Sequence, residues 1–337
     1  TLGYEFPRLY GGGESPILAY DKAVVKTAID FLKARQKEED RKPLLLLVGT
    51  YGPHHTYVAP ENLYHKYKER IGPPRQPSAT AVNSRYQNSV KEFGDDQIHA
   101  MRAAYYGMVE RIDQQLGEVR TAWQDYLSET GESGVFCYVS DHGDQIGERQ
   151  LWGKCTHYEE SVRIPLLFAG EGIAANQEIT TPVSLIDLGT TFCELAGSPD
   201  LPGKDGRSLV PAFGEGGSLE KIPVITDIPP EKGCIGRALR SGPWKLIHFA
   251  NGSGEDQLFN LNDDPFEQQN LMNQETRIAA DLMNLLLHNW SPEKLHAQIA
   301  EKNVHWQIIN QWEKVAEDVE EPFRWPVPAE SLAIPRP

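Results

Sequence analysis

The sequence predicts an α/β protein followed by a small antiparallel subdomain, and three observations support this prediction. Two short apolar runs, at residues 44–48 and 135–139, contain no polar side chain that would mark a solvent-facing side, as is typical of strands covered on both faces. A long helical pattern lies between them, at residues 98–127. Beyond residues 216–217, short strand-like segments alternate with turns, which indicates an antiparallel meander.

The N-terminal part is expected to alternate helix and strand. Apolar residues recur at helical spacing over 24–32, ahead of the run at 44–48, and the Pro-, Ser- and Asn-rich residues 72–96 indicate a long surface excursion. The long helix has one continuous apolar face, made by Ile98, Met101, Tyr105, Met108, Ile112, Leu116, Val119, Trp123 and Leu127. Further strand material is expected at 166–168 and 183–186, followed by a helix over 189–196. Residues 1–215 therefore fit an α/β unit with a mostly parallel sheet.

The C-terminal part is expected to hold the meander and then a tail. The pattern predicts strands at 222–227, 236–241, 244–249 and 256–261 and a helix at 276–289. The tail is rich in Trp, Glu and Pro, with helical spacing from Leu295 to Trp312 and an acidic stretch at 313–321. We expect domain boundaries that separate 1–217, 218–290 and 291–337.

Composition excludes several classes of protein. The 337 residues carry 33 Lys and Arg against 48 Asp and Glu, a net charge of −15, which opposes non-specific binding to nucleic acid or to membrane surfaces. No apolar run approaches the ~18 residues that a membrane span requires. A small anionic substrate held by a few local cations stays possible. The first residues show no signal-peptide pattern and no initiator Met, and the compartment stays open. The four cysteines form no CxxC pair, so we expect buried or half-buried thiols.

Two polar loops follow the apolar runs, where ligands bind in open α/β sheets. Asp141 and His142 come directly after residues 135–139 and can supply adjacent ligands to a divalent cation. His54 can act as a donor or general acid, and Lys154 as a fixed cation for an anionic group. Taken singly, each of these is more often a capping or solvated surface residue. Cys155 lacks a nucleophile's partners and is taken as structural.

Together with the meander, these residues form an ordered set of motifs. The set comprises Tyr138-Val-Ser-Asp-His-Gly-Asp144, Leu151-Trp-Gly-Lys154, Arg163-Ile-Pro165, the Pro-His segment at 51–60, and residues 240–247 with 258–271. It resembles the type I, formylglycine-dependent sulfatase family of the alkaline-phosphatase-like superfamily. The resemblance implies an alkaline-phosphatase-like α/β/α sandwich. It implies that Asp141 and His142 ligate calcium, that Lys154 contacts the sulfate, and that His54 binds the sulfate or protonates the leaving alkoxide.

One half of the family pattern is absent. No Cys or Ser stands in the Cys/Ser-x-Pro/Ala-x-Arg context that yields formylglycine, and the only adjacent Asp pairs lie at 95–96 and 263–264, away from any first buried strand. We therefore expect an N-terminally incomplete sandwich whose nucleophile lies on a missing N-terminal segment or on a second chain. A catalytically degenerate binding protein is the alternative without enzymatic activity.

The substrate class and the tail leave further alternatives. The expected substrate is a small or carbohydrate sulfate ester. A phosphonate monoester or phosphodiester hydrolase of the same superfamily is the other enzymatic interpretation, with Mg or Mn then possible in place of calcium. The tail either packs on its own domain or exchanges with a neighbouring subunit, which would give a homo-oligomer.

Overall fold

The computed structural model describes residues 9–78, 81–89, 92–228, 235–252 and 254–316. The helices of this part are α1 (Pro16–Arg35), α2 (Glu61–Lys68), α3 (Asp95–Thr130), α4 (Glu159–Val162), α5 (Asp187–Leu195), α6 (Thr276–Leu287) and α7 (Pro292–Glu313). The strands are β1 (Tyr10–Gly12), β2 (Tyr57–Ala59), β3 (Val135–Val139), β4 (Leu166–Gly170), β5 (Val224–Asp227), β6 (Gly236–Ser241), β7 (Trp244–Phe249) and β8 (Gln257–Asn260). Four short 3-10 turns complete the order.

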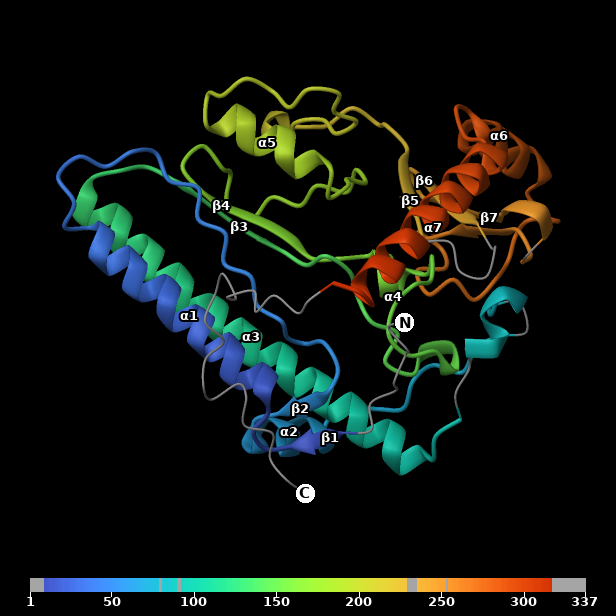
Figure 1. Cartoon of the computed structure of the whole chain (residues 1–337), viewed down its shortest axis with the longest axis horizontal. Helices are drawn as coiled ribbons and strands as arrows, with labels where there is room; N and C mark the ends of the chain where they lie inside the picture. The colour runs from blue at the N-terminus through green and yellow to red at the C-terminus, as the bar shows by residue number, and fades with distance from the viewer. Residues whose placement is uncertain (1–8, 79–80, 90–91, 229–234, 253, 317–337) are drawn as a thin grey trace.

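Two long helices, α1 and α3, run side by side along one side of the molecule (Figure 1). Helix α1 begins where the Ser15 side chain accepts a hydrogen bond from the Leu18 N–H, with Pro16 in the first turn. Helix α3 ends at Gly131, whose φ of 68° is the left-handed conformation that favours glycine. The helices predicted from the sequence are thus confirmed. Strands β3 and β4 lie between the α1–α3 pair and α5 (Figure 1).

The sheets of this part differ from the predicted parallel arrangement. β1 and β2 pair in parallel, but β3 and β4 are antiparallel, with Cys137 opposite Phe168. Residues 44–48 form no strand, and Leu45 and Leu47 are 76% and 90% exposed, so the expectation of a doubly covered strand is wrong here. The segment lacks a neighbouring strand within the described residues, and alternate side chains therefore face solvent. The strand expected at 183–186 is also absent.

Residues 72–96 are more buried than the sequence predicts. Ala81, Asn83 and Tyr86 are buried. Tyr86 packs with Tyr158 and Phe249 in a core that joins this segment to the meander. Residues 72–96 therefore pack at the junction between the N-terminal α/β part and the meander.

The meander agrees with its prediction almost residue for residue. β5, β6, β7 and β8 form one antiparallel sheet in sequence order, with β6 and β7 at their predicted bounds. Helix α6 packs on the sheet through Ala279, Leu282 and Leu286. Helix α7 follows, with no fully buried side chain.

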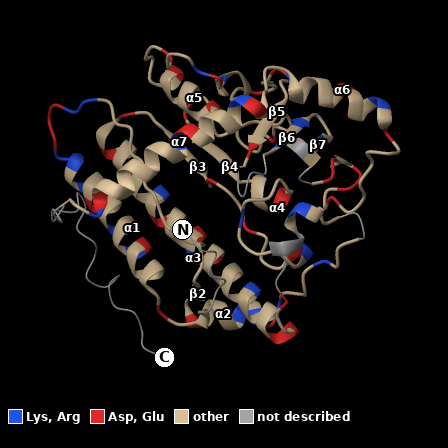
Figure 2. Ribbon diagram, turned by 45° about the vertical axis from the view of Figure 1, so that its right-hand side comes forward, with Lys and Arg blue, Asp and Glu red and all other residues tan. Residues whose placement is uncertain are grey.

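Several other predictions concern charges and cysteines. Figure 2 shows Lys and Arg scattered among Asp and Glu along the ribbon. Asp95 and Asp96 lie in the first turn of α3, where their negative charge stabilises the helix N-terminus.

Cys137, Cys155 and Cys193 are partly buried and free of disulfides, as expected, whereas Cys234 and the tail from 317 onward lie outside the described residues. Among the described residues, no helix is both long enough and apolar enough to cross a membrane.

Candidate functional site

The loop that carries His54 is held by a carboxylate from α1. Asp21 is buried and accepts hydrogen bonds from the backbone N–H groups of Tyr51 and Gly52, at 2.7 and 2.9 Å. Burial raises the pKa of Asp21, and the two N–H groups oppose that rise. Helix α1 therefore fixes the start of the loop, three residues before His54.

The loop that carries Lys154 is organised around Asp144. The Asp144 Oδ1 accepts from the N–H groups of Ile146 and Gly153, both at 3.0 Å, and its Oδ2 accepts from the Tyr57 hydroxyl at 2.7 Å. Burial raises the pKa of the Tyr57 phenol well above its usual range, so it stays a hydrogen-bond donor. Asp144 thus ties the residue before Lys154 to β2, which begins three residues after His54.

A close backbone approach closes the same loop at its other side. The Gly143 N–H donates to the Ser161 carbonyl at 2.8 Å. A Cβ on Gly143 would lie 2.0 Å from the Glu160 carbonyl oxygen, so no larger residue fits this position without displacing the backbone of α4.

These two loops bring His54 and Lys154 together across 100 positions of sequence. The Lys154 Nζ lies 2.6 Å from the His54 Nε2, and the His54 Nδ1 lies 2.8 Å from the His55 carbonyl oxygen. A carbonyl only accepts, so Nδ1 carries the ring proton and Nε2 accepts from the Lys154 ammonium. One of the three ammonium protons is used in this way, and two are left for an anion.

Asp141 and His142 form a second pair at the end of β3. The His142 Nδ1 lies 2.9 Å from the Gly143 carbonyl oxygen, which makes Nδ1 the donor and leaves the Nε2 lone pair free. That Nε2 is 3.5 Å from the Asp141 Oδ2. This separation suits two neighbouring ligands of a cation whose ligand distances are ~2.3–2.6 Å.

The pair alone does not complete a metal site. Within the described residues, no three His, Cys, Asp or Glu side chains gather where they could hold a metal ion. The Asp141 carboxylate is 82% exposed, so its oxygens are available to a cation and to further ligands. Asp141 and His142 therefore fit a cation as two of its ligands.

Three residues of this site were not predicted from the sequence as functional. Asp21 and Asp144 position the two loops, but an Asp in a helix and an Asp after a strand have no distinctive sequence signal. His55 stacks on His54 with ring centroids 4.1 Å apart. Desolvation, with the nearby His54 and Lys154, lowers the pKa of His55, so it stays neutral beside the cation. The double His at 54–55 was the one available signal for this residue.

Two cavities among the described residues lie elsewhere. One, of about 770 Å³, lies between the meander and α7 beside Arg237, Trp290 and Lys294, and the other lies beside Trp123 and Gly134. Neither is lined by His54, Lys154, Asp141 or His142. At the candidate site itself, His54, His142 and Lys154 are half-buried and Asp141 is exposed.

Two family models match the chain. The sulfatase model matches residues 8–198, which include His54, Asp141, His142 and Lys154. The model described as N-sulphoglucosamine sulphohydrolase, C-terminal, matches residues 147–291, from the Lys154 loop through the meander and α6. The two matches overlap on residues 147–198, which include Lys154, α4, β4 and α5.

Individual relatives agree with the family models. Choline-sulfatase of Rhizobium meliloti (strain 1021) is 29% identical over 303 residues, which are 82% of this chain and 57% of that protein. Arylsulfatase K of Danio rerio is 35% identical over 209 residues, which are 59% of this chain and 39% of that protein. The chain therefore spans about half the length of the curated relatives it matches.

A solved structure shows the same fold. The phosphonate monoester hydrolase of Agrobacterium radiobacter matches with a TM-score of 0.66 and 22% identity, over 87% of this chain and 64% of that one. At this identity the likeness concerns the fold, which confirms the predicted alkaline-phosphatase-like α/β architecture with a small C-terminal antiparallel sheet.

Proposed function

The chain belongs to the sulfatase family, and on this premise we propose that it supplies the sulfate-binding half of an active site that hydrolyses a sulfate ester to an alcohol and inorganic sulfate. The observation that carries the proposal is the contact between the His54 Nε2 and the Lys154 Nζ, at 2.6 Å. Both residues were singled out from separate loops of the sequence. A surface lysine and a surface histidine with no shared task would have no reason to meet.

Lys154 is the proposed sulfate-binding cation. Two of its ammonium protons are free of His54 and can donate to sulfate oxygens, where negative charge grows as the ester bond breaks. The Asp144 contacts to Gly153 and Tyr57 hold this cation in place before substrate arrives.

His54 is the proposed proton carrier. Its Nε2 accepts from Lys154 in this structure; when sulfate oxygens replace that contact, Nε2 can take a proton from solvent and present it to the leaving alkoxide oxygen, while Lys154 keeps its charge. The His55 carbonyl holds Nδ1–H in place and fixes the ring orientation.

Asp141 and His142 are the proposed ligands of a divalent cation, which we take to be calcium because a carboxylate at the end of a strand suits a hard ion. A bound cation would neutralise charge on the sulfate oxygens. The pair provides two ligands, and we propose that further ligands and the formylglycine nucleophile come from polypeptide outside residues 1–337. No Cys or Ser within these residues stands in the required context.

The unpaired apolar segment at 44–48 supports this proposal of a further partner. Its two exposed leucines, and the outer edges of β3 and β4, which pair with no other strand of the described residues, offer pairing sites for additional strands. Strands added here would end near the loops of His54 and Asp141, where a nucleophile is needed.

The test uses the protein expressed from its natural reading frame. Hydrolysis of a chromogenic aryl sulfate is compared with that of the matching phosphate diester and phosphonate monoester, before and after chelation and with calcium, magnesium or manganese added back. Preference for the sulfate with recovery by calcium is the expected result. Preference for a phosphorus ester would replace the sulfatase assignment by a phosphonate monoester or phosphodiester hydrolase. Binding of sulfate without turnover of any ester would indicate the binding protein.

The same assay tests Lys154 directly. Lys154→Ala should lower kcat/KM by about 10²–10³-fold, because removing one preorganised donor to a developing anion has an effect of this size. Unfolding by urea should change little, since the half-buried ammonium contributes a single hydrogen bond, to His54. Lys204→Ala, which removes an exposed lysine paired with Asp200, is the control. Retained turnover in Lys154→Ala would refute the role given to this residue.

A further inference from the structure

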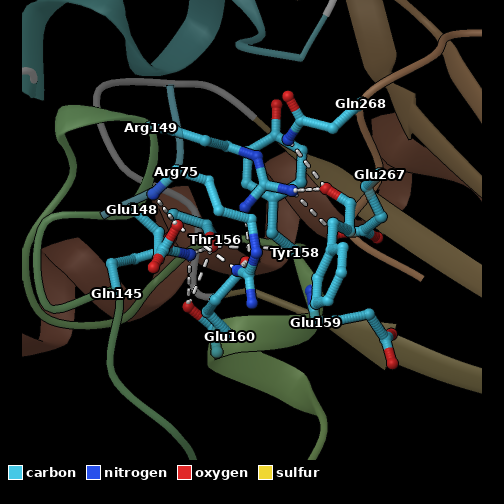
Figure 3. A network of polar contacts seen from close by, with 12 residues as sticks. Arg75, Gln145, Glu148, Arg149, Thr156, Tyr158, Glu159, Glu160, Glu267 and Gln268 are labelled. Carbon is cyan, nitrogen blue, oxygen red and sulfur yellow. Dashed lines mark hydrogen bonds and ion pairs between the residues drawn. The ribbon is translucent and has the colours of Figure 1, made fainter. Parts of the chain in front are cut away.

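We propose that the C-terminal subdomain positions Lys154 through a buried network of charges, so that the meander is a working part of the active site. The network consists of Arg149, Glu159, Glu160, Lys245 and Glu267, and we call it the Arg149–Glu267 network. Figure 3 labels its members Arg149, Glu159, Glu160 and Glu267. The inference rests on the proposed function only in assigning a task to Lys154.

Glu267 is the centre of the network. It comes from the turn after β8, and its side chain is fully buried. One carboxylate oxygen lies 2.7 Å from the Lys245 Nζ, and the other accepts from the Glu159 N–H at 2.9 Å and from the Arg149 guanidinium at 3.4 Å. Burial raises the pKa of Glu267, and Lys245 and Arg149 oppose that rise.

Arg149 carries the connection from the subdomain into the Lys154 loop. Its guanidinium donates to the Phe266 carbonyl at 2.7 Å and to Glu160 at 2.5 Å, and it lies over the Tyr158 ring at 4.2 Å from the centroid. The side chain is 2% exposed. A buried guanidinium with this many partners has one available position, so it fixes the backbone that bears it.

The backbone of the Lys154 loop requires such support. Four residues other than glycine have positive φ there, namely Ile146, Arg149, Gln150 and Cys155, at 38°, 54°, 59° and 70°. Such conformations are unfavourable for residues with a Cβ and persist only where the surroundings impose them. The anchors at Arg149 and Glu159 lie five residues before and after Lys154, so they hold both ends of the segment that carries it.

Two backbone hydrogen bonds connect the residues around Arg149 with those next to Lys154. The Gly147 N–H donates to the Leu151 carbonyl at 2.9 Å, and the Gln145 N–H donates to the Gly153 carbonyl at 2.7 Å. Leu151 packs in the meander core, whereas Trp152 packs in the core of α3 and β2. The loop therefore lies between two hydrophobic cores, and the network secures the side that faces the meander.

The partner charges make this arrangement sensitive to one carboxylate. Lys245 is 3% exposed and pairs with Glu159 at 2.9 Å as well as with Glu267. Removing the charge of Glu267 leaves Lys245 with Glu159 alone and leaves Arg149 with Glu160, so both cations move toward the remaining carboxylates. Since Glu159 and Glu160 begin α4, this movement displaces the end of the loop.

Hydrogen exchange of the complete protein tests the proposal without relying on turnover. Glu267→Gln keeps the shape of the side chain and removes its charge. It should speed exchange of the amides at 143–154 by about tenfold or more, with exchange of β6 and β7 unchanged, because only the local opening becomes easier. Asp227→Asn, which weakens the exposed pair with Arg237 on the same sheet, should leave the loop unchanged.

Two results would overturn the proposal. One is unchanged exchange of the loop in Glu267→Gln. The other is equal acceleration across the loop and β6–β7, which would mean a merely structural role in the subdomain. If Glu267→Gln does not fold, Glu160→Gln, at the edge of the network where the side chain is 16% exposed, gives the same comparison.

Turnover separates this inference from the proposed function. If the protein hydrolyses sulfate esters, Glu267→Gln should lower kcat more than it raises KM, and Glu267→Asp, which restores the charge, should recover part of the loss. If the wild-type protein has no such activity but the loop exchanges faster in Glu267→Gln, the proposed function fails and the positioning by the network stands.

Discussion

Single carboxylates organise the candidate site by accepting backbone N–H groups. Asp21 accepts from the start of the His54 loop, Asp144 from the residue before Lys154, and Glu267 from the first residue of α4. Each carboxylate fixes a backbone segment that has few regular hydrogen bonds of its own. The roles proposed for His54 and Lys154 thus depend on residues that are not themselves proposed to touch the substrate.

His157 gives a prediction about pH at this scale. It is fully buried between Tyr86 and Phe249, and desolvation, with the nearby Lys245, lowers its pKa to about 3. The unfolded chain takes up a proton near pH 6.5, whereas the folded protein does not. The folded state therefore keeps its full stability above that pH and loses about 1.4 kcal/mol per pH unit below it, down to the folded-state pKa.

Urea unfolding at pH 7.5, 6 and 5 measures this slope. His157→Gln, which cannot take up a proton, should flatten it relative to the wild type. His65→Gln, which removes an exposed histidine, should leave it as it is. An equal slope in wild type and His157→Gln would mean that another group causes the acid sensitivity.

The side chains proposed to act in the site were singled out from the sequence, but their supports were not. Asp141 and His142 come directly after an apolar run, and His54 and Lys154 lie in the polar loops that follow the two runs, so residue type and position together were informative. Asp21, Asp144 and Glu267 resemble any surface carboxylate until the chain folds. Their partners lie at distances in sequence of 31, 9 and 108 residues, which no local pattern encodes.

At the scale of elements, α1 acts as the support of the His54 loop. Asp21→Ala should destabilise the fold by about 1–3 kcal/mol, because it removes two hydrogen bonds and leaves the part-buried N–H groups of Tyr51 and Gly52 without this acceptor. Thermal unfolding measures this loss, and hydrogen exchange should show faster exchange at those two amides. Asp30→Ala removes an exposed carboxylate from the same helix and should have little effect. Equal effects of the two changes would contradict the support by Asp21.

The elements that were predicted well are those whose hydrogen bonds are local. The meander strands are joined by short turns, and the helices satisfy their own backbone groups, so periodicity and turn residues were enough. The run at 44–48 was predicted wrongly because an apolar run indicates burial but not the partner that provides it. Likewise, β3 and β4 proved antiparallel because the direction of pairing depends on the connection, which periodicity does not report.

At the scale of the whole molecule, we expect the exposed side chains of Leu45 and Leu47 to promote self-association. For the chain of residues 1–337 studied on its own, Leu45→Ser with Leu47→Ser should reduce self-association, because these side chains are 76% and 90% exposed on an unpaired extended segment. Sedimentation velocity over a range of concentrations measures this. Leu44→Ser with Leu46→Ser, on the half-buried side of the same segment, should lower stability instead. Unchanged self-association of Leu45→Ser with Leu47→Ser would show that residues 44–48 do not mediate it.

The candidate site also has a place in the order of folding. His54 meets Lys154 across 100 residues, Arg149 meets Glu267 across 118, and Ser78 meets Gln268 across 190. These contacts close long loops, whose entropy must be overcome, whereas the strands of the meander are joined by short connections. We therefore expect the site to become ordered after the meander during refolding, so that a chain should regain its helical signal before it can bind an anion.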